Sequence, residues 1–249
     1  MGAPRLEPSR EEKRKQVLKT FDWDRLQEAE CLERIAEAAS LIADVPSSHV
    51  SLMKTETQCV ISGVGMKRHE FVRDHTFCAH TLVKKETLII EDATEDERFE
   101  DNPYVQQEDG IRFYAGLPII VDDVPVGTLC AIDYEPRTLH LADRAELFGL
   151  LHATESYLNM LYEHGSESET YEFASHMTEA RASMTLTRHG EKLERASVQR
   201  LVQSERRLEE CLEAWVPEAG ASQAEHDALE EIDDPVEGIG YEETQPEEE

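Results

Sequence analysis

The chain has 249 residues, of which 39% are hydrophobic, so it is long enough for one ordinary domain with a buried core plus additional segments. Its 54 acidic residues outnumber its 25 basic residues. This imbalance argues against nucleic acids and anionic membrane surfaces as partners, because both attract positively charged proteins.

The acidic surplus is partly local. Residues 217–249 contain 13 Asp or Glu and no Lys or Arg, a composition that predicts a disordered acidic tail. Two explanations of the remaining surplus stay open: a mesophilic protein with an acidic interaction tail, or a halophilic protein whose surface charges are screened, since the Debye length falls to about 3 Å in molar salt. The whole chain has only 8 lysines, which favours the halophilic protein.

The sequence predicts a cytoplasmic protein. It has no apolar run of the roughly 18 residues that a membrane-spanning helix needs, and the N-terminal residues lack the apolar core of a signal peptide. Its five cysteines are odd in number and widely spaced, with no CxxC pair, which favours free thiols in a reducing compartment. They are Cys31, Cys59, Cys78, Cys130 and Cys211.

The first part of the chain predicts a mobile segment, a helix and two strands. Residues 1–21 are charged and contain two prolines, so we expect them to be mobile, with a helix in the later part of the segment as the alternative. Residues 22–43 repeat apolar side chains at intervals of three and four, which predicts a helix. Residues 49–54 and 58–65 read as strands joined by a polar turn.

The middle of the chain alternates short helices with strands. Residues 76–84 predict one or two helical turns, residues 87–90 a short strand, and residues 91–105 a short acidic helix in which Thr94 and Glu97 form a capping box. A hairpin follows, with strands at 111–121 and 126–132 joined by residues 122–125. Both strands are almost continuously apolar, which predicts a central position with both sheet faces covered.

A second long helix is predicted over residues 141–162. Its apolar stripe contains Leu147, Phe148, Leu151, Thr154, Leu158 and Leu161. The element order predicts an α+β domain over residues 22–163, in which the helices at the two ends pack together on one face of an antiparallel sheet. Residues 164–216 predict a helical extension, either a helical hairpin that binds a partner or a short coiled coil.

Four segments, taken together, resemble the GAF domain. They are TFCAHTL at 76–82, LIIEDATEDERFEDNPYV at 88–105, GIRFYAGLPI at 110–119 and VGTLCAID at 126–133. More narrowly, they resemble the sensory GAF domains of bacterial and archaeal signalling proteins. With the acidic composition, this resemblance suggests a halophilic archaeon as the source.

The resemblance implies a fold and a function. The two terminal helices would cover one face of the sheet and mediate a homodimer, while short helices and loops would close a pocket on the other face. The protein would be a non-catalytic sensory or regulatory module that binds a small molecule or senses redox state. It would signal through its terminal helices, with residues 166–216 contacting an unidentified signalling protein. The motif around the chromophore cysteine of bilin-carrying GAF domains is absent, which argues against a bilin. The sequence does not indicate another cofactor.

The resemblance also implies a set of pocket residues. They are Phe77, Cys78, His80, Asp92, Arg98, Phe99, Arg112, Phe113 and Tyr114. Aromatic walls with a few polar groups suit small-molecule recognition, and Arg98 and Arg112 suit a carboxylate or phosphate. Structural roles are the alternative: Arg98 would pair with Asp92 or Asp96, and Arg112 with an acidic neighbour.

Three further alternatives concern the cysteines and the pocket. Cys78 and His80 could bind a metal, but no second ligand pair lies near them in sequence, so packed free thiols are the favoured interpretation. A free methionine-R-sulfoxide reductase, an enzymatic GAF branch, would use Cys78 for thiol chemistry. A domain whose pocket is filled would serve only as a scaffold for dimerisation.

Overall fold

The structure is a computed structural model that describes residues 3–65 and 69–165, together with positions 175, 178 and 182. The expectations for the acidic tail at 217–249 and for almost all of the helical extension at 164–216 lie outside the described residues. Within them, no helix combines the length and the apolar character that crossing a membrane requires.

An antiparallel sheet forms the centre of the described fold. The strand order is β3-β2-β1-β6-β5-β4, and every neighbouring pair is antiparallel. The strands are β1 (Ser47–Met53), β2 (Thr57–Val64), β3 (Glu70–Val72), β4 (Leu88–Ile90), β5 (Phe113–Val121) and β6 (Val124–Asp133). The central place of β6 and β5 agrees with their apolar sequences, because both of their faces are covered.

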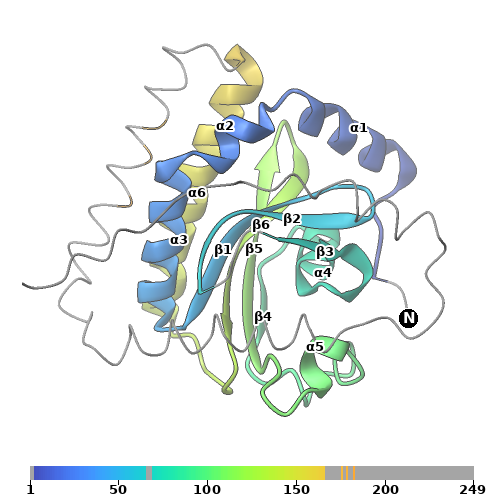
Figure 1. Ribbon diagram of the computed structural model, residues 1–249, viewed down its shortest axis with the longest axis vertical. Helices are drawn as coiled ribbons and strands as arrows, with labels where there is room; N and C mark the ends of the chain where they lie inside the picture. Colours follow the sequence, from blue (N-terminus) through green and yellow to red (C-terminus); the bar gives the residue numbers. More distant parts are fainter. Residues whose placement is uncertain (1–2, 66–68, 166–174, 176–177, 179–181, 183–249) are drawn as a thin grey trace, which may run out of the picture. The chain divides into compact units, whose positions relative to one another are not determined.

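Two long helices cover one face of the sheet. Figure 1 shows α3 (Glu30–Ala43) and α6 (Leu141–His164) side by side on that face, as the element order predicted. The apolar stripe expected on α6 is buried except at Phe148, which is 42% exposed. The helix expected over 22–43 is divided: α2 (Trp23–Gln27), capped by the Asp22 carboxylate, precedes α3.

Short helices and loops cover the other face. Helix α4 (Phe77–Lys84) packs on β5 and β6, and α5 (Pro103–Gln106) lies in the loop that precedes β5 (Figure 1). A 3-10 turn, Arg73–His75, leads from β3 into α4. The buried side chains of this face form a second hydrophobic cluster, separate from the one under α3 and α6.

The N-terminal segment is ordered where mobility was expected. Helix α1 (Pro8–Lys19) buries Arg14, Val17 and Leu18, and Ala3 and Leu6 join the core beside α4. The expectation of mobility is therefore corrected for the described residues 3–21. The physical reason is an ion-pair network with distant residues, which a charged sequence does not reveal.

The acidic stretch at 91–102 forms turns in place of the expected helix. The Asp92 carboxylate accepts hydrogen bonds from the backbone N–H and the hydroxyl of Thr94, at 3.0 and 2.7 Å, so Thr94 does not cap a helix. Asn102 accepts from the Tyr104 N–H at 2.9 Å and starts α5 instead.

The β5–β6 hairpin has a tighter turn than expected. Asp122 and Asp123 both have positive φ, 48° and 62°, as a two-residue type I′ turn requires. Val124 and Pro125 therefore belong to β6. Pro125 is accommodated because the register shifts between Ile119 and Ile120, where a bulge leaves a ladder position without its hydrogen bond.

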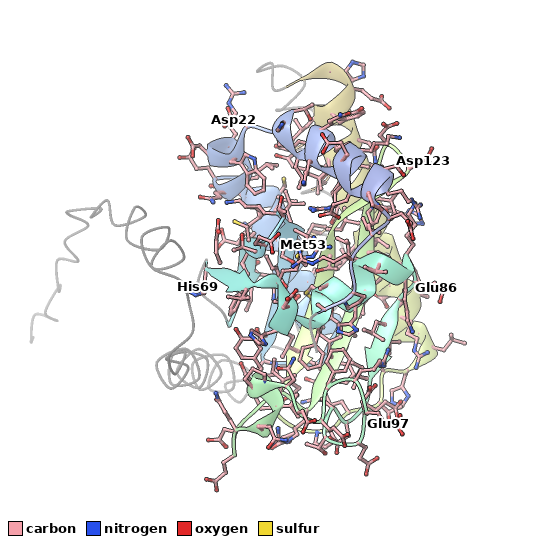
Figure 2. All side chains as sticks on the ribbon, turned by 90° about the vertical axis from the view of Figure 1, so that its right-hand side faces the viewer. Asp22, Met53, His69, Glu86, Glu97 and Asp123 are labelled. Atoms are coloured by element: carbon pink, nitrogen blue, oxygen red, sulfur yellow. The ribbon has the colours of Figure 1, made fainter. Side chains whose placement is uncertain are left out.

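Most charged side chains lie at the surface of the fold and most apolar side chains in its core. Figure 2 shows the labelled Met53 inside the fold, whereas Asp22, Glu86, Glu97 and Asp123 lie at its periphery. The core between the sheet and α4 contains the polar and sulfur-bearing groups described next.

Candidate functional site

The candidate site lies where β1, β5 and β6 meet the N-terminal half of α4. His49 of β1 is paired with Cys130 of β6, so their side chains leave the same face of the sheet. Tyr114 of β5 lies on that face as well, and Cys78 of α4 lies above it. All four side chains are buried.

The two thiols and the imidazole are in direct contact. The Sγ atoms of Cys78 and Cys130 are 3.5 Å apart, and Cys130 Sγ is 3.0 Å from Nε2 of His49. Gln58 of β2 places its Nε2 at 3.2 Å from the same His49 nitrogen. The arrangement is thus a compact cluster of two sulfur atoms and one ring nitrogen, with an amide beside it.

Tyr114 connects this cluster to α4. Its hydroxyl donates to Cys78 Sγ at 3.4 Å and is 3.0 Å from the Thr81 hydroxyl. Gly116 makes this position possible, because a Cβ there would lie 2.1 Å from the Tyr114 hydroxyl oxygen. A glycine two residues after the tyrosine is therefore required for close approach on this strand face.

Burial and mutual contact shift the pKa values of these groups. Burial alone would raise the pKa of the Cys78 thiol, but its contacts with Cys130 and His49 outweigh burial and lower that pKa well below the usual value. Burial and the neighbouring Cys78 raise the pKa of Cys130, and burial and both cysteines raise that of Tyr114. The contacts within the cluster therefore favour deprotonation of Cys78 over that of Cys130.

A small cavity borders the cluster. Its volume is about 40 Å³. It is lined by His49, Gln58, Phe71, Thr76, Phe77, Cys78, Tyr104, Ile111, Tyr114 and Ile132. Of the residues expected from the sequence, the structure brings Phe77, Cys78 and Tyr114 to this cavity.

Phe99 and His80 lie behind the wall of the cavity. Phe77 stacks between Phe99, at a centroid distance of 4.2 Å, and Tyr114, at 5.1 Å. His80 lies 4.7 Å from the Phe99 ring, and burial together with Arg98 lowers its pKa. His80 does not meet Cys78 in the cluster: the imidazole that contacts the thiols belongs to His49.

Asp92 and Arg98 have structural partners. Arg98 forms two hydrogen bonds with the Asp96 carboxylate, at 2.8 and 2.5 Å, and its side chain is exposed. Asp92 caps the turn at Thr94. The structural alternative for Arg98 is therefore the one that the geometry matches, with Asp96 as the partner.

Arg112 holds a loop in place. Its guanidinium donates to the backbone carbonyls of Val105, Gln107 and Glu108, at 2.9, 3.0 and 2.9 Å, and weakly to that of Ile111 at 3.2 Å. Backbone carbonyl oxygens take the place of the expected acidic partner. Arg112 is not among the residues that line the cavity. Arg112 thus fastens the loop that carries α5 and Tyr104 over the cavity.

Phe113 lies on the opposite face of β5. It is fully buried in the cluster under α3 and α6, so its placement in the pocket is corrected. Successive strand residues point to opposite faces, and Tyr114 occupies the pocket face.

Sequence reasoning missed His49 and Gln58. Both lie in strands that were expected, but their faces were not assigned. The alternation in β1 gave a usable signal: Val50 and Leu52 face the helices, so His49 and Met53 face the cavity layer.

Comparisons with known proteins identify the family of this fold. The family model of the GAF domain matches residues 27–153, just over half of the chain. The chain belongs to the GAF domain family. GAF domains are a sensory or regulatory kind of domain, and the resemblance seen in the sequence is confirmed at this level.

One curated relative matches part of this GAF protein. A cyclic di-GMP phosphodiesterase of Pseudomonas aeruginosa is 38% identical over 109 residues, which are 43% of this chain and 19% of that protein. The chain therefore spans about a fifth of the length of this relative.

The solved structures that are similar to this chain have low sequence identity to it. The GAF domain of an Acinetobacter phosphoenolpyruvate-protein phosphotransferase is 12% identical, with a TM-score of 0.46, over 65% of this chain and all of that chain. The type II free methionine-R-sulfoxide reductase of Thermoplasma acidophilum is 12% identical, with a TM-score of 0.41, over 55% of this chain and 95% of that chain.

Proposed function

We propose that this GAF protein is a non-catalytic sensory or regulatory module. Its input would be a small molecule or a redox change at the cavity beneath α4 and α5. The observation that carries the proposal is the position of that cavity: its surface is almost entirely apolar, and it borders the few polar groups of this core, among them those of His49, Gln58 and Cys78. Groups of this kind confer specificity in small-molecule sites.

The size of the cavity limits what it accepts in this conformation. A volume of about 40 Å³ accommodates a few water-sized molecules, whereas ligand pockets generally have roughly 300–1,000 Å³. A larger ligand would require the loop held by Arg112 to move. The small volume also favours the second candidate function, a scaffold that dimerises and binds no ligand.

The terminal helices would transmit the signal to a dimer or partner interface. Helix α6 exposes Leu141 and Phe148, which are 81% and 42% exposed, beside a surface groove of about 580 Å³. Thr87, Ile89, Arg144 and Ala145 complete that groove. Exposed apolar side chains beside a groove support a homodimer through this face, and we propose residues 166–216 as the contact with a signalling partner.

The phosphodiesterase and reductase activities of the similar proteins have no support in this chain. The phosphodiesterase named above is about five times longer than the matched stretch, so its activity is not proposed here. A methionine sulfoxide reductase would have to admit an amino acid to Cys78, and the present cavity has no room for one. Turnover of free methionine sulfoxide by the reduced protein would contradict the non-catalytic proposal.

Native mass spectrometry of protein purified from its own host tests the main proposal. We expect a dimer that retains a stoichiometric small molecule, because both the cavity and the exposed α6 face would then be occupied. Tyr114→Phe, which keeps the ring but removes the hydroxyl, should weaken retention; Tyr162→Phe, at a half-buried site outside the cavity, is the control. A dimer without a bound small molecule would contradict this proposal and favour the second candidate function, a scaffold for dimerisation.

The acidic composition supports a protein that operates at high salt. With a formal net charge of −29, its surface charges repel one another at low ionic strength. We expect the thermal midpoint to rise as KCl increases from millimolar to molar concentration, since screening weakens this repulsion. Thermal unfolding followed by circular dichroism measures it. A midpoint that stays constant or falls over this range would contradict a halophilic origin.

A further inference from the structure

Three potential metal ligands converge in the core of this protein. Nε2 of His49 and the Sγ atoms of Cys78 and Cys130 all lie within 4.8 Å of one another. Two sulfur ligands of a tetrahedral zinc ion lie about 3.8 Å apart, and a sulfur and a nitrogen ligand about 3.6 Å apart, given Zn–S near 2.3 Å and Zn–N near 2.0 Å. The observed separations of 3.5 Å between the sulfurs and 3.0 Å between Cys130 Sγ and His49 Nε2 are shorter than these by about 0.3 and 0.6 Å, so the ligands would have to move apart slightly to admit the ion.

The hydrogen bonds of the cluster are incomplete without a further atom. His49 Nε2 can make one hydrogen bond, yet both Cys130 Sγ and Gln58 Nε2 approach it, at 3.0 and 3.2 Å. Gln58 is 3% exposed, and within the described part of the chain its Oε1 is buried with no hydrogen-bond partner. A buried polar group without a hydrogen-bond partner destabilises the folded state. A bound ion would be coordinated by the lone pair of His49 Nε2 and by both thiol sulfurs.

We propose that His49, Cys78 and Cys130 form a buried zinc site with one open coordination position. Two thiolates and a neutral imidazole give a divalent ion a site of zero net charge, so the filled site needs no counter-ion in the core. Thiolate and imidazole ligands select Zn²⁺ or Cu⁺ over Mg²⁺ and Ca²⁺, which prefer oxygen ligands. The proposal does not depend on the sensory function, because the same three ligands would bind zinc whether the ion stabilises the fold or takes part in sensing.

The hydroxyl groups around the two sulfur atoms suit this role, whereas Nδ1 of His49 is buried and has no hydrogen-bond partner among the described residues. The Tyr114 hydroxyl donates to Cys78 Sγ at 3.4 Å, and the Thr128 hydroxyl is 3.6 Å from Cys130 Sγ and 3.0 Å from Ser51. Hydrogen bonds of this kind hold thiolate ligands in place and lower their basicity.

The open position faces the cavity. His49, Gln58 and Cys78 all line it, and its volume of about 40 Å³ suits a water molecule or a Lewis base of a few atoms as the fourth ligand. Rotation of the Gln58 amide would bring its unpartnered Oε1 to the side of His49 and offer a protein ligand for the same position. A site of three protein ligands with one exchangeable position is the arrangement in which zinc binds exogenous molecules.

Anaerobic titration with Co²⁺ tests the site. The full chain would be stripped with a chelator, kept in a phosphine reductant and titrated, because Co²⁺ in a tetrahedral thiolate site gives an intense charge-transfer band. We expect this band to saturate at one equivalent and to disappear when one equivalent of Zn²⁺ is added. Zn²⁺ should also raise the thermal midpoint of the stripped protein, since a ligand that binds the folded state stabilises it.

Cysteine variants assign the ligands. A triple variant with Cys31, Cys59 and Cys211 replaced by alanine keeps only the proposed thiols, and it should bind Co²⁺ as the wild type does. Cys59 is a suitable member of this control set, because it lies outside the group of converging side chains formed by His49, Cys78 and Cys130. Cys78→Ser and Cys130→Ser should each weaken binding by 100-fold or more, with circular dichroism confirming that they fold.

Each contrary outcome is distinct. A folded, reduced wild type with no charge-transfer band at one equivalent overturns the site, even if it later forms a disulfide between Cys78 and Cys130. A band that survives in both serine variants, or is lost in the triple variant, overturns the ligand assignment. None of these results depends on whether a small organic molecule is retained in native mass spectrometry, so this proposal and the proposed function fail separately.

Discussion

Replacing Glu11 by glutamine should lower the free energy of unfolding by about 3–5 kcal/mol. Glu11 is the shared partner of Arg14 and Arg73, whose side chains are both fully buried. Its carboxylate accepts from Arg73 Nη1 at 2.8 Å and from Arg14 Nε at 3.2 Å. Glutamine keeps the size but removes the charge, so two guanidinium groups would remain in the core without a carboxylate. Urea unfolding followed by circular dichroism measures the loss.

The neighbouring Glu12→Gln is the matched control. Glu12 is exposed and the same change of charge should alter stability by no more than about 0.5 kcal/mol. Equal effects of the two substitutions would show that net charge, and not the buried network, determines the result.

The same carboxylate should give a pH signature. Burial would raise the pKa of Glu11, but the hydrogen bonds from Arg14 and Arg73 outweigh it, and the pKa in the folded state is lowered below its ordinary value of 4.5. The stabilisation is therefore complete above pH 4.5 and is lost as the pH falls below it, because the unfolded chain takes up the proton first. Glu11→Gln should remove this part of the acid dependence, which strengthens the assignment.

Arg112→Ala should lower the free energy of unfolding by about 2–4 kcal/mol and loosen one loop selectively. Arg112 donates to carbonyls of Val105, Gln107 and Glu108, and hydrogen bonds from a charged donor are among the stronger ones in proteins. Backbone amides of residues 103–111 should lose hydrogen-exchange protection first, while those of β1 and β6 keep it. Hydrogen exchange monitored by mass spectrometry resolves the two regions.

Arg98→Ala is the matched control for the loop. Arg98 is also an arginine of this face, but it is exposed, forms its ion pair with Asp96 and lies 5.3 Å from the centre of the Phe99 ring, so its loss should cost at most about 1 kcal/mol. Unchanged exchange at 103–111 in Arg112→Ala would show that the loop is held by packing alone.

Long, regular patterns were sufficient for most of the fold. The stripe of α6 and the alternation of the first two strands predicted these elements because helical and strand periods differ. Helix α1 was considered only as an alternative to mobility for the opposite reason: its buried face includes Arg14, so the segment has no apolar stripe to detect. Its position depends on Arg73, which is 62 positions away in the chain.

The candidate site was only partly predictable for two physical reasons. Phe113 and Tyr114 are both aromatic, and a strand that is apolar on both faces does not indicate which one faces the pocket. His49 and Cys130 are 81 positions apart, so no local spacing links them; only the pairing of β1 with β6 brings them together. Sequence reasoning therefore placed the metal hypothesis on His80, which is close to Cys78 along the chain but not in the cluster.

The place of α1 has a practical consequence for where this domain begins. The family match starts at residue 27, whereas the carboxylate that neutralises Arg73 is at residue 11. A fragment cut at the family boundary would lose Glu11 and uncover the apolar surface that Ala3, Leu6, Val17 and Leu18 protect. The folded unit therefore begins before the family match, because α1 packs on β6 and supplies Glu11 to Arg73.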